Sequence, residues 1–288
     1  MKPARFAYDA PPTLAAALAL LAEHRDDAKV VAGGQSLAPM LNMRLVQPAR
    51  LIDINGLPEL ASVTRDGDRL VVGALMRHAD LARDPIVAAQ CPMLACAAGT
   101  IGHYAIRQRG TLGGSLAHAD PAAQLPLVAL ALDAEIEVAS AAGRRRIPAR
   151  DFFVSILATA LAPDELIVAV RFPVRGPREG WSFRLFSRRA GDFALAAVAA
   201  SLALSADGAL AALRLAAGGL GPVPLRVDQL SGLATGVPMS RERAAAAARA
   251  VGAAAEIEEN ERVPADYRRE LLAALAQDAL DEALERAR

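Results

Sequence analysis

The stretch KVVAGGQSLAPML, Lys29 to Leu41, joins two apolar segments through a pair of adjacent glycines. The valines before the glycines predict the end of a buried strand, and apolar residues at near-helical spacing from Leu37 to Leu45 predict a helix. Gly33 to Ser36 would then form a strand-to-helix turn. Such a turn can use Ser36 as a helix cap, or it can direct free backbone N–H groups at an anion.

A second glycine cluster, GTLGGS from Gly110 to Ser115, also leads toward a helix. The pair Asp120-Pro121 is typical of a helix start and predicts a helix over AAQLPLVALAL. Two such turns in one domain would be able to face each other and surround a diphosphate with backbone donors, with hydroxyls added by Ser36, Thr111 and Ser115. Neither cluster has the glycine spacing of a Rossmann or P-loop site.

The charge balance argues against a nucleic-acid partner. The 288 residues include 32 Lys and Arg and 32 Asp and Glu, so the formal net charge is zero, whereas phosphate binding needs a concentrated positive surface. The length predicts about two domains. The apolar run LAAALALLA follows Asp9 and two prolines and lacks a clear cleavage site, so we expect a helix capped by Thr13 and not a secretion signal.

The sequence supports no metal site in this chain. It has two cysteines, Cys91 and Cys96, which we expect on one helix and pointing in different directions. Its four histidines show no ligand spacing, and an iron–sulfur cluster would need more cysteines.

The pattern of elements changes near Gly176 to Gly180, which indicates a domain boundary. Strands and helices alternate before it, so a mixed α/β layering is expected. After Trp181, three runs separated by turn residues predict a three-stranded antiparallel sheet, although the Ala-rich middle run is also compatible with a helix. From Ser240 onward two helices, split at Pro264, would cover one face of that sheet.

Four segments carry a family resemblance over nearly the whole chain: AGGQSLAPMLNMRL, LIDIN, IRQRGTLGGSLAHADPAAQLPL and FSRRAGDFAL. In these segments the sequence resembles the FAD-binding medium subunit of the molybdenum hydroxylases, the family of xanthine dehydrogenase and aerobic carbon monoxide dehydrogenase. The resemblance implies an α+β chain with a vanillyl-alcohol-oxidase-type FAD-binding domain of two α/β subdomains at residues 1–177. A small α+β domain with a three-stranded antiparallel sheet and helices would follow at 178–288.

The resemblance implies that both glycine loops hold the FAD diphosphate. The positions carried over are Ala32, Gly33, Gly34, Gln35, Ser36 and Leu37 in the first loop and Thr111, Gly113, Gly114 and Ser115 in the second. Gln124 departs from the family, which usually has Asp or Glu there in contact with the cofactor. An amide still donates and accepts hydrogen bonds, so FAD binding remains the expectation.

Further cofactor contacts are implied by the resemblance alone. Ile101 matches a position that packs near the adenine, and Ile167 matches a second apolar contact. Arg184 matches a basic residue near the isoalloxazine, where a positive charge would stabilise reduced, anionic flavin. Phe193 matches an aromatic residue close to the same ring. From the residues alone, ordinary core packing is the default for either isoleucine, and a solvated strand position is the alternative for Arg184. Phe193 is equally compatible with a core position in the second domain.

The implied role is electron transfer, with no catalytic residue and no metal in this chain. Partner subunits would carry a molybdenum cofactor and [2Fe–2S] clusters, the assembly would be a dimer of heterotrimers, and electrons would leave from FAD to an external acceptor. We expect a cytoplasmic complex, able to lie at the inner face of the membrane. The alternative is a stand-alone flavin oxidoreductase of the same superfold.

Overall fold

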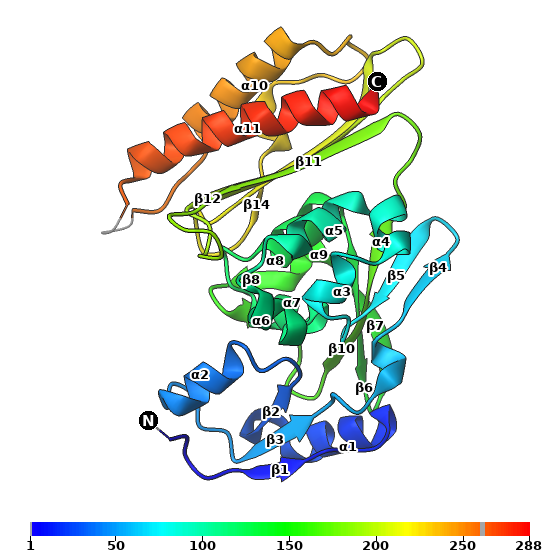
Figure 1. Ribbon diagram of the computed structural model, residues 1–288, viewed down its shortest axis with the longest axis vertical. Coiled ribbons are helices and arrows are strands. Elements are labelled where there is room, and N and C mark those ends of the chain that lie inside the picture. The colour runs from blue at the N-terminus through cyan, green and yellow to red at the C-terminus, as the bar shows by residue number, and fades with distance from the viewer. Residues whose placement is uncertain (1, 260–262) are drawn as a thin grey trace.

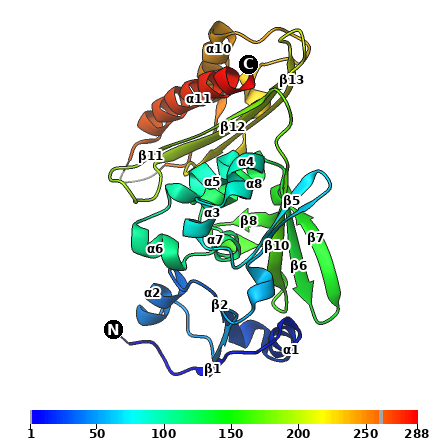
Figure 2. The same ribbon diagram turned by 45° about the vertical axis from the view of Figure 1, so that its right-hand side comes forward.

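The computed structural model describes residues 2–259 and 263–288, and Figures 1 and 2 show its elements stacked in three groups along the long axis. The N-terminal group, blue in Figure 1, lies at one end of the molecule, and the C-terminal group, yellow to red, lies at the other. The middle group contains most of the short helices.

The N-terminal group is a three-stranded parallel sheet in the order β1-β3-β2 with two helices. Thr13 begins the first helix as expected, because its hydroxyl accepts the Ala16 N–H at 3.2 Å. The elements are β1 (Ala7–Asp9), α1 (Leu14–His24), the 3₁₀ turn η1 (Arg25–Asp27), β2 (Ala28–Val31), α2 (Leu37–Asn42), β3 (Arg50–Asp53) and η2 (Pro58–Leu60).

The middle group is a five-stranded antiparallel sheet in the order β4-β5-β10-β6-β7, with short helices packed beside it (Figure 2). Its strands are β4 (Val63–Asp66), β5 (Arg69–Gly73), β6 (Glu135–Ser140), β7 (Gly143–Pro148) and β10 (Leu166–Pro173), with a separate pair β8 (Phe153–Ser155) and β9 (Ala158–Thr159). Its helices are α3 (His78–Leu81), α4 (Pro85–Gln90), α5 (Pro92–Gly99), α6 (Tyr104–Arg109), α7 (Leu112–His118), α8 (Gln124–Ala131) and α9 (Ala149–Phe152).

The C-terminal group is an antiparallel sheet in the order β11-β12-β13-β14, covered on one face by two helices (Figure 1). Its elements are β11 (Glu179–Phe186), β12 (Ala196–Leu204), β13 (Leu210–Gly218), β14 (Leu225–Arg226), η3 (Asp228–Ser231), α10 (Arg241–Ala254) and α11 (Ala265–Ala287). The Ala-rich middle run is strand β12, as the antiparallel prediction required. The expected three-stranded sheet gains a fourth strand of two residues, β14.

Two local predictions were wrong. The helix expected after Asp120-Pro121 begins at Gln124, because the Asp120 carboxylate accepts the Ala122 N–H at 2.8 Å and forms a turn before it. The cysteines do not share one helix. Cys91 lies where α4 ends and α5 begins at Pro92, and it is buried, whereas Cys96 within α5 is exposed.

The main hydrophobic core joins the middle and C-terminal groups. Phe183, Ala197 and Ala216 of the C-terminal sheet belong to the same buried cluster as Leu127 of α8. The face of the sheet opposite α10 and α11 therefore packs on the middle group. The division at residues 177 and 178 falls between β10 and β11 and stays a prediction. Within residues 2–259 and 263–288, no helix combines the length and apolarity needed to cross a membrane.

Candidate functional site

The two glycine loops meet backbone to backbone. A Cβ atom added to Gly33 would lie 2.3 Å from the Arg109 carbonyl oxygen and 2.8 Å from the Gly110 Cα. Only glycine permits this approach, because a real Cβ essentially never comes this close to backbone. The structure therefore brings loop 32–37 and loop 110–115 together, although they are far apart in sequence.

The first loop carries a row of free backbone donors. From Gly33 to Leu37, five consecutive N–H groups have no hydrogen-bond acceptor among the described residues. Gly34 adopts a φ of +70°, a left-handed conformation that favours glycine. Ser36 occupies the N-cap position of α2, but its side chain makes no capping hydrogen bond. The arrangement fits the anion-binding alternative better than a simple cap, because successive free N–H groups form concave anion sites.

The second loop, by contrast, uses most of its donors internally. The N–H groups of Leu112 and Gly113 donate to the Met76 and Ala74 carbonyls at 3.0 and 2.8 Å. The Gly114 N–H donates to the Thr111 hydroxyl at 3.1 Å, which caps α7. The expectation that both loops offer backbone donors is thus wrong for most of the second loop. That loop instead leaves the Ser115 hydroxyl without a hydrogen-bond partner among the described residues.

Three residues beside the loops were missed by the sequence analysis: Asn55, Arg77 and His78. Asn55 follows β3, and its Nδ2 donates to the Ala32 carbonyl at 2.8 Å. Arg77 lies at the N-cap of α3 and donates to Asn55 and to the Arg109 carbonyl. His78 Nε2 lies 2.9 Å from the Thr111 carbonyl, and burial lowers the pKa of His78 to about 4. A neutral imidazole that donates from Nε2 fits this contact.

The predicted apolar contacts lie in different environments. Ile101 is half-buried between α5 and α6, with its carbonyl accepting a hydrogen bond from Arg107 at 2.8 Å. Ile167 is 3% exposed in β10 and belongs to the main core.

Gln124 begins α8 and is buried, and its amide has no side-chain hydrogen bond to another described residue. Gln124 thus keeps its donors and acceptor available to a ligand.

Arg184 and Phe193 come from the C-terminal group. Arg184 forms an ion pair with Glu282 of α11 at 3.2 Å, so its side chain lies toward the helices that cover the sheet. Its place beside the isoalloxazine stays a prediction that this contact does not support. Phe193 is 60% exposed in the loop between β11 and β12, which excludes a core position. A Cβ on Gly191 of that loop would lie 2.8 Å from the His103 ring, so the loop contacts the α5–α6 turn.

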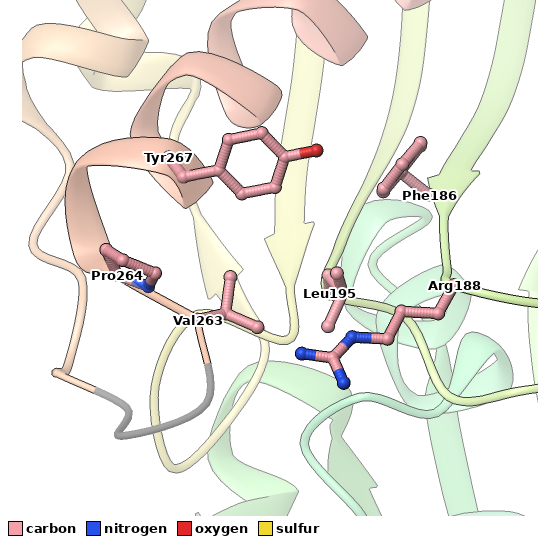
Figure 3. A pocket seen from close by; sticks show the side chains of 6 residues that line it. All are labelled: Phe186, Arg188, Leu195, Val263, Pro264 and Tyr267. Carbon is pink, nitrogen blue, oxygen red and sulfur yellow. The ribbon is translucent and has the colours of Figure 1, made fainter.

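A separate surface pocket of about 360 Å³ lies in the C-terminal group (Figure 3). Figure 3 shows Tyr267 and Pro264 at the start of α11 facing Phe186 and Leu195 at the ends of β11 and β12. None of its lining residues belongs to either glycine loop.

The donor set suits a diphosphate and not a metal. Among the described residues, no group of three or more His, Cys, Asp and Glu side chains is placed to hold a metal ion. Gly33 and Gly110 have no side chains where the loops touch, and the first loop has five free N–H groups from Gly33 to Leu37. These features fit the phosphate part of a nucleotide cofactor.

Family comparison decides which cofactor this is. Residues 4–175 match the family described as FAD binding domain in molybdopterin dehydrogenase, and residues 181–283 match the CO dehydrogenase flavoprotein C-terminal domain. The chain belongs to the FAD-binding medium subunits of the molybdenum hydroxylases. As such a medium subunit it is part of an oxidoreductase and binds FAD.

Several relatives match this medium subunit over nearly their whole length. The 6-hydroxypseudooxynicotine dehydrogenase complex subunit alpha of Paenarthrobacter nicotinovorans is 39% identical, over 100% of this chain and 97% of its own. A solved carbon monoxide dehydrogenase of Hydrogenophaga pseudoflava has a TM-score of 0.94 at 37% identity, covering 99% of both chains. Quinoline 2-oxidoreductase of Pseudomonas putida 86 has a TM-score of 0.93 at 35% identity, covering 100% of this chain and 99% of that one. These likenesses confirm the expected α+β fold.

Proposed function

We propose that this medium subunit binds the diphosphate of FAD between loop 32–37 and loop 110–115. We further propose that it is the electron-exit subunit of its complex, from which electrons leave to an external acceptor. The observation that carries the proposal is the row of five free N–H groups from Gly33 to Leu37, placed against the second loop. A phosphate oxygen accepts such donors strongly because the hydrogen bonds are charge-assisted. The Thr111 and Ser115 hydroxyls and the Gln124 amide add polar contacts from the opposite side.

The proposed apolar contacts would hold the two ring systems of the cofactor. Leu37 ends the first loop, Ile101 is half-buried between α5 and α6, and both would pack against the nucleotide. Phe193 is exposed on a loop that reaches the α5–α6 turn, so it would cover the isoalloxazine from the C-terminal group. The flavin supplies the redox chemistry when bound, and the residues of this chain supply position and electrostatics.

Membership of the family supports a proposal for the remainder of the complex. We propose a large subunit with the molybdenum cofactor, a small subunit with [2Fe–2S] clusters, a dimer of such heterotrimers, and a cytoplasmic location. Electrons taken from substrate in the large subunit would reach FAD in this chain and leave to an external acceptor. The names of relatives include three different substrates: caffeine, carbon monoxide and quinoline. This chain is nevertheless similar to all three proteins over nearly its whole length. Substrate choice would therefore reside in the large subunit.

Comparison of flavins tests the binding mode directly. The purified 288-residue chain, stripped of flavin, is titrated with FAD and with FMN and followed by flavin fluorescence. FMN has one phosphate and no adenosine, so a diphosphate site predicts binding of FAD that is at least about 100-fold tighter. Equal affinity for the two flavins would contradict the proposed site.

A further inference from the structure

A chain of hydrogen bonds connects the two glycine loops behind their contact. Asn55 Nδ2 donates to the Ala32 carbonyl of the first loop at 2.8 Å. The Asn55 Oδ1 accepts from Arg77 Nη2 at 2.7 Å, and Arg77 Nη1 donates to the Arg109 carbonyl at 2.5 Å. We call this connection, from Ala32 through the two side chains to Arg109, the Asn55–Arg77 bridge.

Each end of the bridge is anchored independently of the other. Asp53 Oδ1 accepts from the Asn55 backbone N–H at 2.8 Å and from its Nδ2 at 2.6 Å, which orients the amide. Tyr8 in turn donates its hydroxyl to Asp53. Arg77 pairs with Thr111 in an isolated antiparallel β-bridge, so its backbone is tied to the second loop as well. The side chains therefore occupy defined positions between β3 and the start of α3.

The bridge ends at the carbonyl group on which the loop contact depends. Gly33 rests against the Arg109 carbonyl, where an added Cβ would lie at 2.3 Å, and Arg77 donates to the oxygen of the same carbonyl. A guanidinium group has a rigid, planar fork of donors, so it can hold two acceptors at a set separation, which a lysine ammonium on a flexible stem does not. The spacing of the two loops is thus coupled to one arginine.

We infer that Asn55 and Arg77 are positioning residues that set the separation of the two glycine loops for the FAD diphosphate. The inference rests on the proposed diphosphate site. Neither side chain has to touch the cofactor for this role, because both act on it through the backbone carbonyls of Ala32 and Arg109. Loss of either side chain leaves Ala32 and Arg109 without the link, so the free N–H groups of the first loop are no longer held opposite the second loop.

The test measures the FAD affinity of the 288-residue chain by fluorescence titration for four variants: Arg77→Lys, Arg77→Ala, Asn55→Ala and the double alanine variant. Loss of one charge-assisted hydrogen bond in an organised site predicts at least about tenfold weaker FAD binding. Arg77→Lys is expected to bind FAD as weakly as Arg77→Ala. The double variant is expected to have the same FAD affinity as the single alanine variant that binds FAD less tightly, because both substitutions break one connection.

The control is Arg83→Ala, which removes an exposed arginine that forms no ion pair with another described residue and is expected to keep wild-type FAD affinity. Thermal unfolding of each flavin-free variant checks folding. Asn55→Asp replaces Asn55→Ala where the latter does not fold, since it removes the Nδ2 donor to Ala32 and keeps an oxygen for Arg77.

Two outcomes would overturn the inference and indicate separate charge effects: wild-type FAD affinity in Arg77→Lys, or additive losses of FAD affinity in the double variant. If wild-type protein binds FAD no better than FMN, the proposed diphosphate site fails instead.

Discussion

Among single residues, Gly33 has the strictest requirement. The substitution Gly33→Ala would place a Cβ 2.3 Å from the Arg109 carbonyl oxygen, so the two loops must move apart. We expect FAD affinity to fall by at least about tenfold, and overpacking to lower the free energy of unfolding by about 1–3 kcal/mol. Fluorescence titration and urea unfolding measure the two effects. Gly56→Ala is the matched control, because no atom lies within 4 Å of the position that its methyl group would take; wild-type affinity in Gly33→Ala would contradict the loop contact.

His78 makes stability depend on pH. Burial lowers its pKa to about 4 from 6.5, and the positive charges of Arg107 and Arg77 act in the same direction. As pH falls below 6.5, His78 binds a proton in the unfolded chain but stays neutral in the folded chain. The stability present above pH 6.5 is therefore lost progressively down to about pH 4. The total loss is on the order of 3 kcal/mol.

The variant His78→Gln isolates this effect, because glutamine keeps an N–H donor for the Thr111 carbonyl but does not titrate. Thermal unfolding of both proteins between about pH 4.5 and pH 7.5 is the measurement. Wild-type protein should lose stability more steeply than the variant below pH 6.5. Parallel pH profiles would show that His78 is not the titrating group.

Sequence patterns located both glycine loops but not the roles of their atoms. The pattern around Gly113 suggested a close approach to phosphate. In the structure, a Cβ on Gly113 would lie 2.6 Å from the Cβ of Ala74. The missing side chain therefore allows α7 to pack against the end of β5. Asn55 ends the segment LIDIN, to which the sequence analysis assigned no cofactor role, and Arg77 carried no local signal, since its hydrogen bonds join residues 22 and 32 positions apart. Such contacts depend on the folded chain and not on neighbouring sequence.

At the level of elements, α11 packs on β11 through a glycine. A Cβ on Gly180 would lie 1.7 Å from the Ala283 carbonyl oxygen, so the helix backbone rests directly on the strand. Gly180→Ala should displace α11 and lower the free energy of unfolding by about 1–3 kcal/mol or more, as measured by urea unfolding. Gly221→Ala is the control, because its site is open; equal stability of the two variants would contradict this packing.

Element types followed from hydrophobic patterns, and element ends did not. The turn residues between the last three long strands predicted an antiparallel sheet, and β12 is a strand despite its alanines because it is buried between α11 and the middle group. Burial outweighed helix propensity there. The start of α8 was misplaced because Asp120 can either cap a helix or close a turn, and sequence alone does not choose between them.

Across the whole molecule, the C-terminal group would complete the proposed flavin site. Its sheet shares a core with the middle group, and its β11–β12 loop contacts the α5–α6 turn with Phe193 exposed nearby. This placement depends on packing between groups of elements, so the sequence predicted a second domain without showing where it lies. An exposed aromatic residue at this junction fits a site that is closed only when cofactor and partner subunits are present.

The proposed electron-exit role means that this chain transfers electrons and does not oxidise substrate itself. The decisive measurement is anaerobic stopped-flow absorbance of the FAD-loaded chain, alone and in complex with its large and small subunits. The probes are compounds from the names of relatives: carbon monoxide, quinoline, caffeine, nicotine and glyceraldehyde. We expect a probe to reduce the flavin only in the complex. Rapid reduction of FAD in the isolated chain by any of these compounds would contradict the role and favour a stand-alone flavin oxidoreductase.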